Sequence, residues 1–251
     1  QGLPGTGKTL LLYDMAMKLS VRQQVCLIHC GEAVEQWKVL HERLRRVKYL
    51  TDAQITSDIL SGASAVLVDE AHLLSQEKLE YLLRYCGKRP VIFSSDYENM
   101  LSPEELDRAA VHALEQISGI QSFRLTNRIR TNAEISSFIQ NMMCLPERKK
   151  GRHFPHVTVL YANDDREADV LLSDAQHQGY QVILNEAEPA ICAGRLAMVL
   201  DQRYFYDRQN YLRSEDRSVR RLFHQLNGAK EELLLVVKQN EPLYAALLDL
   251  L

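Results

Sequence analysis

The chain has 251 residues, of which 46% are hydrophobic and 25% charged, and its formal net charge is −3. These values are ordinary for a globular protein of one or two domains, and no apolar run approaches the length of a membrane span. The acidic balance argues against a wholly basic nucleic-acid binder but leaves room for a local basic track. Five scattered cysteines without a C-x-x-C pair argue against zinc and favour a reduced, cytoplasmic setting.

The first nine residues carry the pattern G-x-x-x-x-G-K-T, which is typical of a loop that binds nucleotide phosphates. Glycines let backbone N–H groups turn toward an anion, and a helix predicted over residues 10–20 adds its positive end. Lys8 is expected to reach the outer phosphates, and the Thr9 hydroxyl to hold Mg²⁺. The residues expected to bind the nucleotide are Gly2, Pro4, Gly5, Thr6, Gly7, Lys8 and Thr9.

The alternative interpretation of this loop is a glycine-rich turn before a surface helix. It is the weaker one, because a chain of this length shows the pattern by chance about one time in a hundred. In a doubly wound sheet, however, such a loop follows a central buried strand, and no residues for that strand precede Gln1. We therefore expect the sequence to be part of a longer protein.

A strand is predicted at residues 25–30, and a helix at 33–46. The basic end of that helix is better explained as a solvated helix terminus than as a nucleic-acid contact.

The second motif is an apolar strand that ends in Asp69-Glu70-Ala71-His72. At this strand tip, Asp69 is expected to hold the Mg²⁺ shell, and Glu70 to orient and deprotonate the attacking water. His72 is expected to couple the site to a second lobe or to the polymer. An apolar run followed by Asp-Glu is common by chance, but it is far more specific about sixty residues after a phosphate loop.

Helices and strands alternate along the rest of the chain. Helices are predicted at 75–86, 102–118, 131–143, 166–178, 218–229 and 242–251, and strands at 90–96, 122–125, 157–161, 181–184, 196–200 and 233–237. Arg130 then lies at a strand-to-helix junction, on the rim where ligands bind in open α/β sheets. The tyrosine-rich stretch 202–217 is predicted to be a surface loop.

This alternation predicts an α/β fold of two lobes with mostly parallel sheets. We expect a first lobe at residues 1–146 with both nucleotide motifs, a basic, proline-bounded linker at 147–156, and a smaller second lobe at 157–251.

These motifs, in this order, resemble those of superfamily 1 DNA and RNA helicases, and most closely the helicase-like ATPase domain of Schlafen-type proteins and their bacterial relatives. The resemblance covers nearly the whole chain and rests on residues 2–9, 69–72, 125–131 and 219–237. It implies two RecA-like lobes that bind ATP and Mg²⁺ between them, with single-stranded DNA or RNA tracking across both.

Residue by residue, the resemblance implies that Arg130 faces the γ-phosphate and that Asp96 stands where the family has its nucleotide-sensing aspartate. Two departures accompany it: the glutamine that follows this aspartate is absent, and Gly228 replaces the arginine finger of a late motif. Such an arginine is worth several powers of ten in rate, because it neutralises charge in the transition state. Arg221 lies about 10 Å away along the predicted helix, too far to substitute. We therefore expect slow hydrolysis.

The leading hypothesis is an ATP-hydrolysing motor of the helicase class. The runner-up is a nucleotide switch that regulates a fused or partner effector domain without unwinding. An AAA+ ATPase shares both motifs, but its lid is all-helical, whereas residues 157–237 are rich in predicted strands. Small-molecule kinases usually lack an Asp-Glu-Ala-His motif, so they rank below the other hypotheses.

Overall fold

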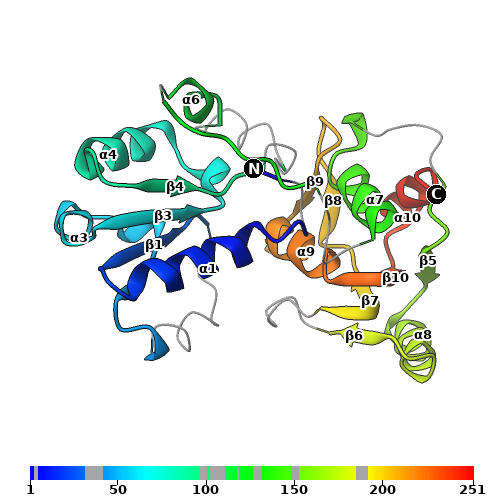
Figure 1. Cartoon of the computed structure of the whole chain (residues 1–251). Coiled ribbons are helices and arrows are strands. Elements are labelled where there is room, and N and C mark those ends of the chain that lie inside the picture. Colours follow the sequence, from blue (N-terminus) through cyan, green and yellow to red (C-terminus); the bar gives the residue numbers. More distant parts are fainter. Residues whose placement is uncertain are drawn as a thin grey trace. The chain divides into compact units, whose positions relative to one another are not determined.

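The computed structural model describes residues 1–2, 5–31, 42–96, 101, 111–117, 119–126, 132–147, 153–184, 192–216 and 218–251. The chain forms two compact units of nearly equal length, Gln1–Asn127 and Arg128–Leu251 (Figure 1). Each unit contains a four-stranded sheet in which all pairings are parallel. The expected fold class, α/β with mostly parallel sheets in two units, is therefore confirmed.

The sheet of the first unit has the strand order β2-β1-β3-β4. Its strands are β1 (Val25–His29), β2 (Val47–Thr51), β3 (Ala65–Asp69) and β4 (Val91–Phe93). Its helices are α1 (Lys8–Ser20), α3 (Ser57–Gly62), α4 (Gln76–Cys86) and α6 (Val111–Gln116), with 3-10 turns η1 (Asp52–Gln54) and η2 (Ala71–Leu73). Strand β3 is buried along its whole length, as expected for an inner strand of a parallel sheet.

The two faces of this sheet are covered by different helices. Side chains alternate along a strand, so Val25 and Leu27 pack with Leu12 of α1, whereas Cys26 and Ile28 pack with residues of α3 and α4. Strand β2 is not anticipated by the sequence analysis, because its Lys48 and Tyr49 interrupt the apolar run of an edge strand. Most of the helix predicted at 33–46 lies outside the described residues.

Residues 122–125 do not form the predicted strand. Only Leu125 pairs, in a parallel bridge with Gly2, and its backbone N–H donates to Gln1 O over 2.8 Å. On the other side, Gly2 N–H donates to Ser95 O over 3.3 Å. The start of the phosphate loop therefore lies between Leu125 and the segment that follows β4.

The sheet of the second unit has the strand order β5-β10-β7-β6. Its strands are β5 (Val157–Ala162), β6 (Gln181–Ile183), β7 (Ala193–Leu200) and β10 (Ala229–Lys238). Its helices are α7 (Ala133–Met143), α8 (Asp165–His177), α9 (Val219–Leu226) and α10 (Glu241–Leu248), with a 3-10 turn η3 (Leu145–Glu147). Helix α8 covers one face, and α7 lies across the other (Figure 1).

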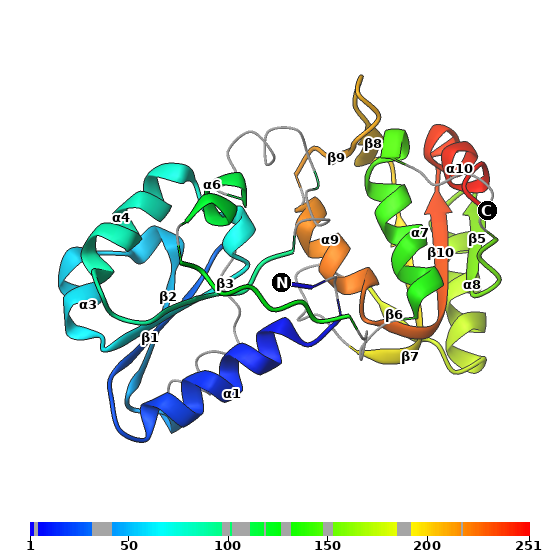
Figure 2. The same ribbon diagram turned by 45° about the horizontal axis from the view of Figure 1, so that its top comes forward.

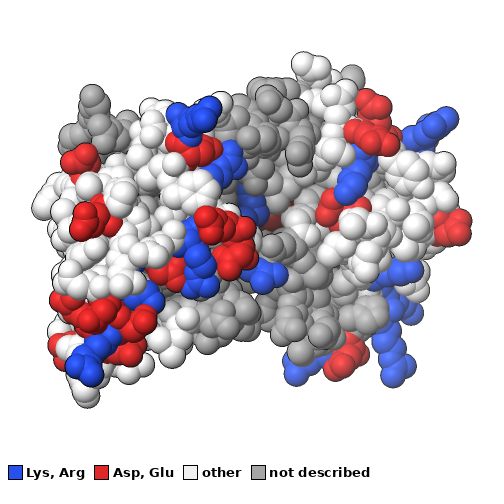
Figure 3. Space-filling view, turned by 180° about the vertical axis from the view of Figure 1, so that it is seen from behind, with Lys and Arg blue, Asp and Glu red and all other residues white. Residues whose placement is uncertain are grey.

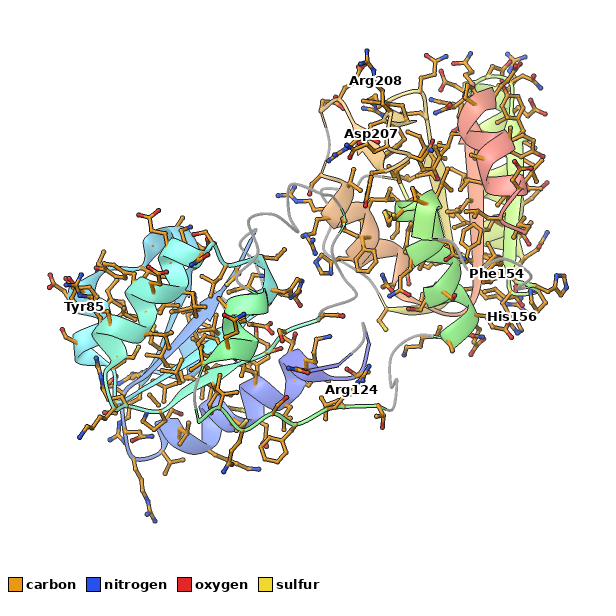
Figure 4. All side chains as sticks on the ribbon, turned by 90° about the horizontal axis from the view of Figure 1, so that it is seen from above. Tyr85, Arg124, Phe154, His156, Asp207 and Arg208 are labelled. Carbon is orange, nitrogen blue, oxygen red and sulfur yellow. The ribbon has the colours of Figure 1, made fainter. Side chains whose placement is uncertain are left out.

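Helix α7 belongs to the second unit, because it packs on β10 and α9. The units therefore divide after Asn127, whereas the sequence analysis places the first boundary at 146. The cap of α7 is Asn132, whose side chain accepts from Glu134 N–H over 2.8 Å. Residue 131, where the helix is predicted to begin, lies outside the described residues. Within the stretch expected as a linker, Phe154 is buried against Phe138 of α7, with ring centroids 5.5 Å apart (Figure 4).

Residues 202–217 contain a hairpin instead of the predicted loop. Strands β8 (Tyr204–Tyr206) and β9 (Leu212–Ser214) pair antiparallel, and Tyr204 and Leu212 are buried. Tyrosine is a strong strand former, which accounts for the composition. The hairpin extends beyond the ends of α7 and α10 (Figure 2). Among the described residues, no helix is long and apolar enough to cross a membrane.

Candidate nucleotide-binding site

The loop before α1 has the backbone of an anion-binding turn. Gly5 (φ 77°) and Gly7 (φ 85°) adopt left-handed conformations that favour glycine, and Gly7 caps α1. A Cβ atom on Gly2 would lie 2.6 Å from Thr6 Oγ1 and 3.0 Å from Leu125 O, so only glycine fits there. The loop therefore leads directly into the positive end of a 13-residue helix. Pro4 lies outside the described residues.

The Lys8 side chain extends to the segment that follows β4. Its Nζ donates to Gly2 O over 2.7 Å and to Asp96 Oδ2 over 3.1 Å. The side chains of this ion pair are only 8% and 2% exposed. A pair this buried is costly to desolvate, so its presence at the mouth of the loop calls for a functional explanation.

Thr9 and Asp69 meet although they are far apart in the sequence. The Thr9 hydroxyl donates to Asp69 Oδ2 over 3.0 Å, and His29 Nδ1 lies 3.5 Å from the same oxygen. Burial alone would raise the pKa of Asp69, but the hydrogen bonds from His29 and Thr9 hold it below its usual range. Asp69 is therefore a carboxylate at neutral pH.

These oxygens fit a magnesium ion. Mg²⁺ prefers hard oxygen ligands, and the hydroxyl of Thr9 and the carboxylate of Asp69 supply them side by side. Asp69 Oδ1 is buried and accepts no well-formed hydrogen bond from the described part of the chain, which leaves it available as a ligand. The structure shows no group of three or more His, Cys, Asp or Glu side chains arranged to hold a metal within its described residues.

Glu70 follows Asp69 in a left-handed conformation (φ 53°, ψ 38°), which is uncommon for a residue other than glycine. Such strained conformations persist where the surroundings hold them, and they gather at functional sites.

His72, which the sequence analysis expects to couple the site to a second lobe or to the polymer, has no solvent-exposed surface in the structure. It is fully buried, because η2 folds it back under the strand tips. Its Nδ1 accepts from Asp96 N–H over 3.2 Å, so the ring proton of the neutral imidazole lies on Nε2, which is 3.4 Å from Glu70 Oε2. His72 thus accepts a hydrogen bond from the backbone of Asp96 and lies beside the Glu70 carboxylate within the first unit.

The expected site residues that the structure describes therefore form one cluster, in which Asp69 ends β3, Glu70 follows it and Asp96 follows β4. Sequence reasoning did not single out His29, although a polar residue ends an apolar strand there and pairs in register with Asp69. Arg130 lies outside the described residues.

The sequence analysis places Gly228 in a helix predicted at 218–229, but in the structure Gly228 lies outside any helix. Helix α9 ends at Leu226, and Gly228 occupies the junction before β10. Its N–H donates to Gln225 O over 2.8 Å, and its carbonyl accepts from Ala193 N–H over 3.1 Å.

No family model and no curated protein matches the chain. Solved structures similar to it include the Pif1 helicase from Bacteroides in complex with ADP-AlF3 and ssDNA, with a TM-score of 0.38, 14% identity, and coverage of 71% of this chain and 52% of that one. The Pif1 helicase from Candida albicans has a TM-score of 0.37 and 14% identity, over 70% of this chain and 50% of that one. The helicase MrfA bound to DNA has a TM-score of 0.38 and 12% identity, over 94% of this chain and 43% of that one. The chain spans about half the length of the solved structures that it matches.

Proposed function

We propose that this chain binds ATP with Mg²⁺ on its N-terminal loop and hydrolyses it, as a helicase-like motor of two RecA-like lobes that acts on single-stranded DNA or RNA. One observation carries the ATPase proposal: the Thr9 hydroxyl and Asp69 Oδ2 lie 3.0 Å apart at the start of α1, next to the buried Lys8. The motor class rests on the order of the motifs along the chain.

Each residue has a role that its position supports. The Asp96 carboxylate keeps the Lys8 ammonium at the mouth of the loop, and a phosphate oxygen would replace that carboxylate when the nucleotide binds. Thr9 and Asp69 would hold Mg²⁺, which supplies charge neutralisation at the β- and γ-phosphates. Glu70 would accept a proton from the attacking water, and Nε2 of His72 lies 3.4 Å from its carboxylate.

The test is the stabilisation that ATP confers. With Mg²⁺ and ATP at a hundredfold excess over the dissociation constant, the wild-type protein should gain about 2.7 kcal/mol of apparent stability. Lys8→Ala should lose this gain, because the phosphates lose their buried cation. Lys18→Ala is the matched control, since Lys18 lies on the same helix with its side chain 74% exposed. An equal ATP-induced shift of the melting temperature in wild type and Lys8→Ala would refute the proposal.

A second candidate function is a nucleotide switch that regulates a fused or partner effector. Gly228 favours it, because the sequence has glycine where the family resemblance leads us to expect the arginine finger. A switch should hydrolyse ATP slowly, without stimulation by single-stranded DNA or RNA. Fast, polymer-stimulated phosphate release by the wild-type protein would exclude the switch, and slow release that Gly228→Arg accelerates would support it.

A further inference from the structure

The β8–β9 hairpin is firmly anchored to the second unit by its inner face. Tyr204 and Leu212 are buried, and the Tyr206 hydroxyl donates to Met142 O over 2.8 Å at the end of α7. At the tip, Leu145 N–H donates to Asn210 O over 3.1 Å. The hairpin is therefore held in one orientation although it extends beyond the neighbouring helices (Figure 2).

The tip of the hairpin is organised by Asp207. One carboxylate oxygen accepts from Gln209 N–H over 2.9 Å and from Tyr211 N–H over 3.0 Å, and the other accepts from Arg213 Nε over 2.7 Å. Asn210 completes the turn in a left-handed conformation (φ 62°), which asparagine tolerates well. A tip ordered in advance loses little conformational entropy when it binds a partner.

The outer face combines an exposed aromatic ring with guanidinium groups. Phe205 is 43% exposed, and its cross-strand partner is Arg213. Two of the three arginines in residues 203–213 are paired within the hairpin region, since Arg203 pairs with Asp201 and Arg213 with Asp207. Arg208 points outward from the tip and forms no ion pair with a described residue (Figure 4).

On the face that Figure 3 shows, charge alone does not mark a binding track among the described residues. On the face seen in Figure 3, the described Lys and Arg side chains are interspersed with Asp and Glu. A contact with a polyanion must therefore draw on something besides net charge. Flat aromatic rings provide it, because every nucleic-acid base has a face that stacks on them.

We propose that the β8–β9 hairpin binds single-stranded nucleic acid, with a base stacked on Phe205 and a backbone phosphate held by Arg208. Arg213 neutralises Asp207, so the carboxylate at the tip does not repel the phosphate. The inference rests on the proposed action on nucleic acid and assigns this contact to the second unit. It gives a function to the tyrosine-rich stretch that the nucleotide site does not use.

The test measures binding of a fluorescein-labelled oligodeoxythymidine to the full chain by anisotropy. Phe205→Ala should weaken binding about tenfold, as expected for the loss of one stacked base, and Phe205→Trp should restore it. Arg208→Ala should reduce the slope of log affinity against log salt by about 0.7, the value for one phosphate contact on a single strand. The controls are Tyr85→Ala, an exposed aromatic on α4, and Arg166→Ala, an exposed arginine on α8.

The outcomes separate this inference from the function on which it rests. Binding by the wild type that Phe205→Ala and Arg208→Ala leave unchanged would overturn the hairpin contact alone, provided that both variants melt as the wild type does. An equal loss of polyglutamate binding in Phe205→Ala would indicate a general polyanion contact and would also overturn it. No binding of oligodeoxythymidine or oligouridine by the wild type would overturn the proposed function together with the inference.

Discussion

The carboxyl edges of the two sheets carry similar residue types in different surroundings. In the first unit, the Lys8–Asp96 pair is almost fully buried, with side chains 8% and 2% exposed. In the second, Arg203 and Asp201 pair with side chains 39% and 15% exposed, beside a cavity of about 170 Å³ that Lys238 also lines. Water screens the second pair, whereas the first is retained in spite of a large desolvation cost. Charged residues at strand tips therefore indicate a site when burial makes them expensive to keep.

The largest expected effect concerns Glu70, which we propose as the general base of the first unit. Glu70→Gln should keep ATP binding but lower turnover by about a thousandfold, because an amide cannot accept the proton of the attacking water. Phosphate release at saturating ATP checks this, with Glu77→Gln on the exposed side of α4 as the matched control. Equal turnover in wild type and Glu70→Gln would remove Glu70 from the mechanism.

Stability measurements compare the two ion pairs directly. Lys8→Met should lower the free energy of unfolding by about 3 kcal/mol, because it leaves the buried Asp96 carboxylate without this cation. Arg203→Met should change it by less than about 1 kcal/mol, since its pair is screened by water. Urea unfolding of both variants without nucleotide gives the two values. Similar losses would show that burial does not distinguish the two edges.

Substitutions at two glycines of the first unit test the packing of the loop before α1. Gly2→Ala should cost about 1–3 kcal/mol, because its methyl group would overlap Thr6 Oγ1 at 2.6 Å. Gly62→Ala is the control: a Cβ there meets nothing within 4 Å, and alanine in α3 should stabilise by up to about 1 kcal/mol. Thermal melts of both variants would contradict the loop packing if Gly2→Ala melted at the wild-type temperature.

A further prediction concerns the thiols and alkaline pH. Burial raises the pKa of Cys26 to about 12, so the folded chain keeps a proton that the unfolded chain loses above about pH 9. The free energy of unfolding should therefore fall between about pH 9 and pH 12, by up to about 1.4 kcal/mol per pH unit for this thiol. Urea unfolding at increasing pH measures the fall, which should be smaller in Cys26→Ala.

Thiol labelling at neutral pH provides a companion measurement. Cys192 of the second unit is exposed, whereas the other four cysteines are buried. A disulfide reagent should therefore react quickly with one thiol and reach the rest only on unfolding. Rapid reaction of Cys26 would contradict the packing of the first core.

Local patterns in the sequence predicted much of the site. The spacing of glycines before Lys8 specifies a turn and a helix start within a few residues, so neighbouring atoms alone decide it. The apolar run before Asp69 predicted a buried strand, and parallel strands bring their carboxyl ends to one edge. The meeting of Thr9 with Asp69 follows from these two facts.

The structure decided what depends on contacts between distant segments. Whether His72 points outward or inward is set by the turn of η2 beneath Asp96, and no local pattern around residue 72 encodes that packing. The sequence analysis did not predict the β8–β9 hairpin, because a short strand that is buried on one side and polar on the other resembles a loop when its partner strand is unknown.

By itself, the sequence determined the α/β class, the glycine-rich turn before α1 and the acidic strand tip, because each depends on residues close together in the chain. Only the tertiary structure decided that Lys8 pairs with Asp96, that His29 supports Asp69, and that α7 belongs to the second unit. Each of these depends on which strands become neighbours and on which surfaces exclude water. Burial, which turns an ordinary ion pair into a costly one, arises when the whole unit has folded.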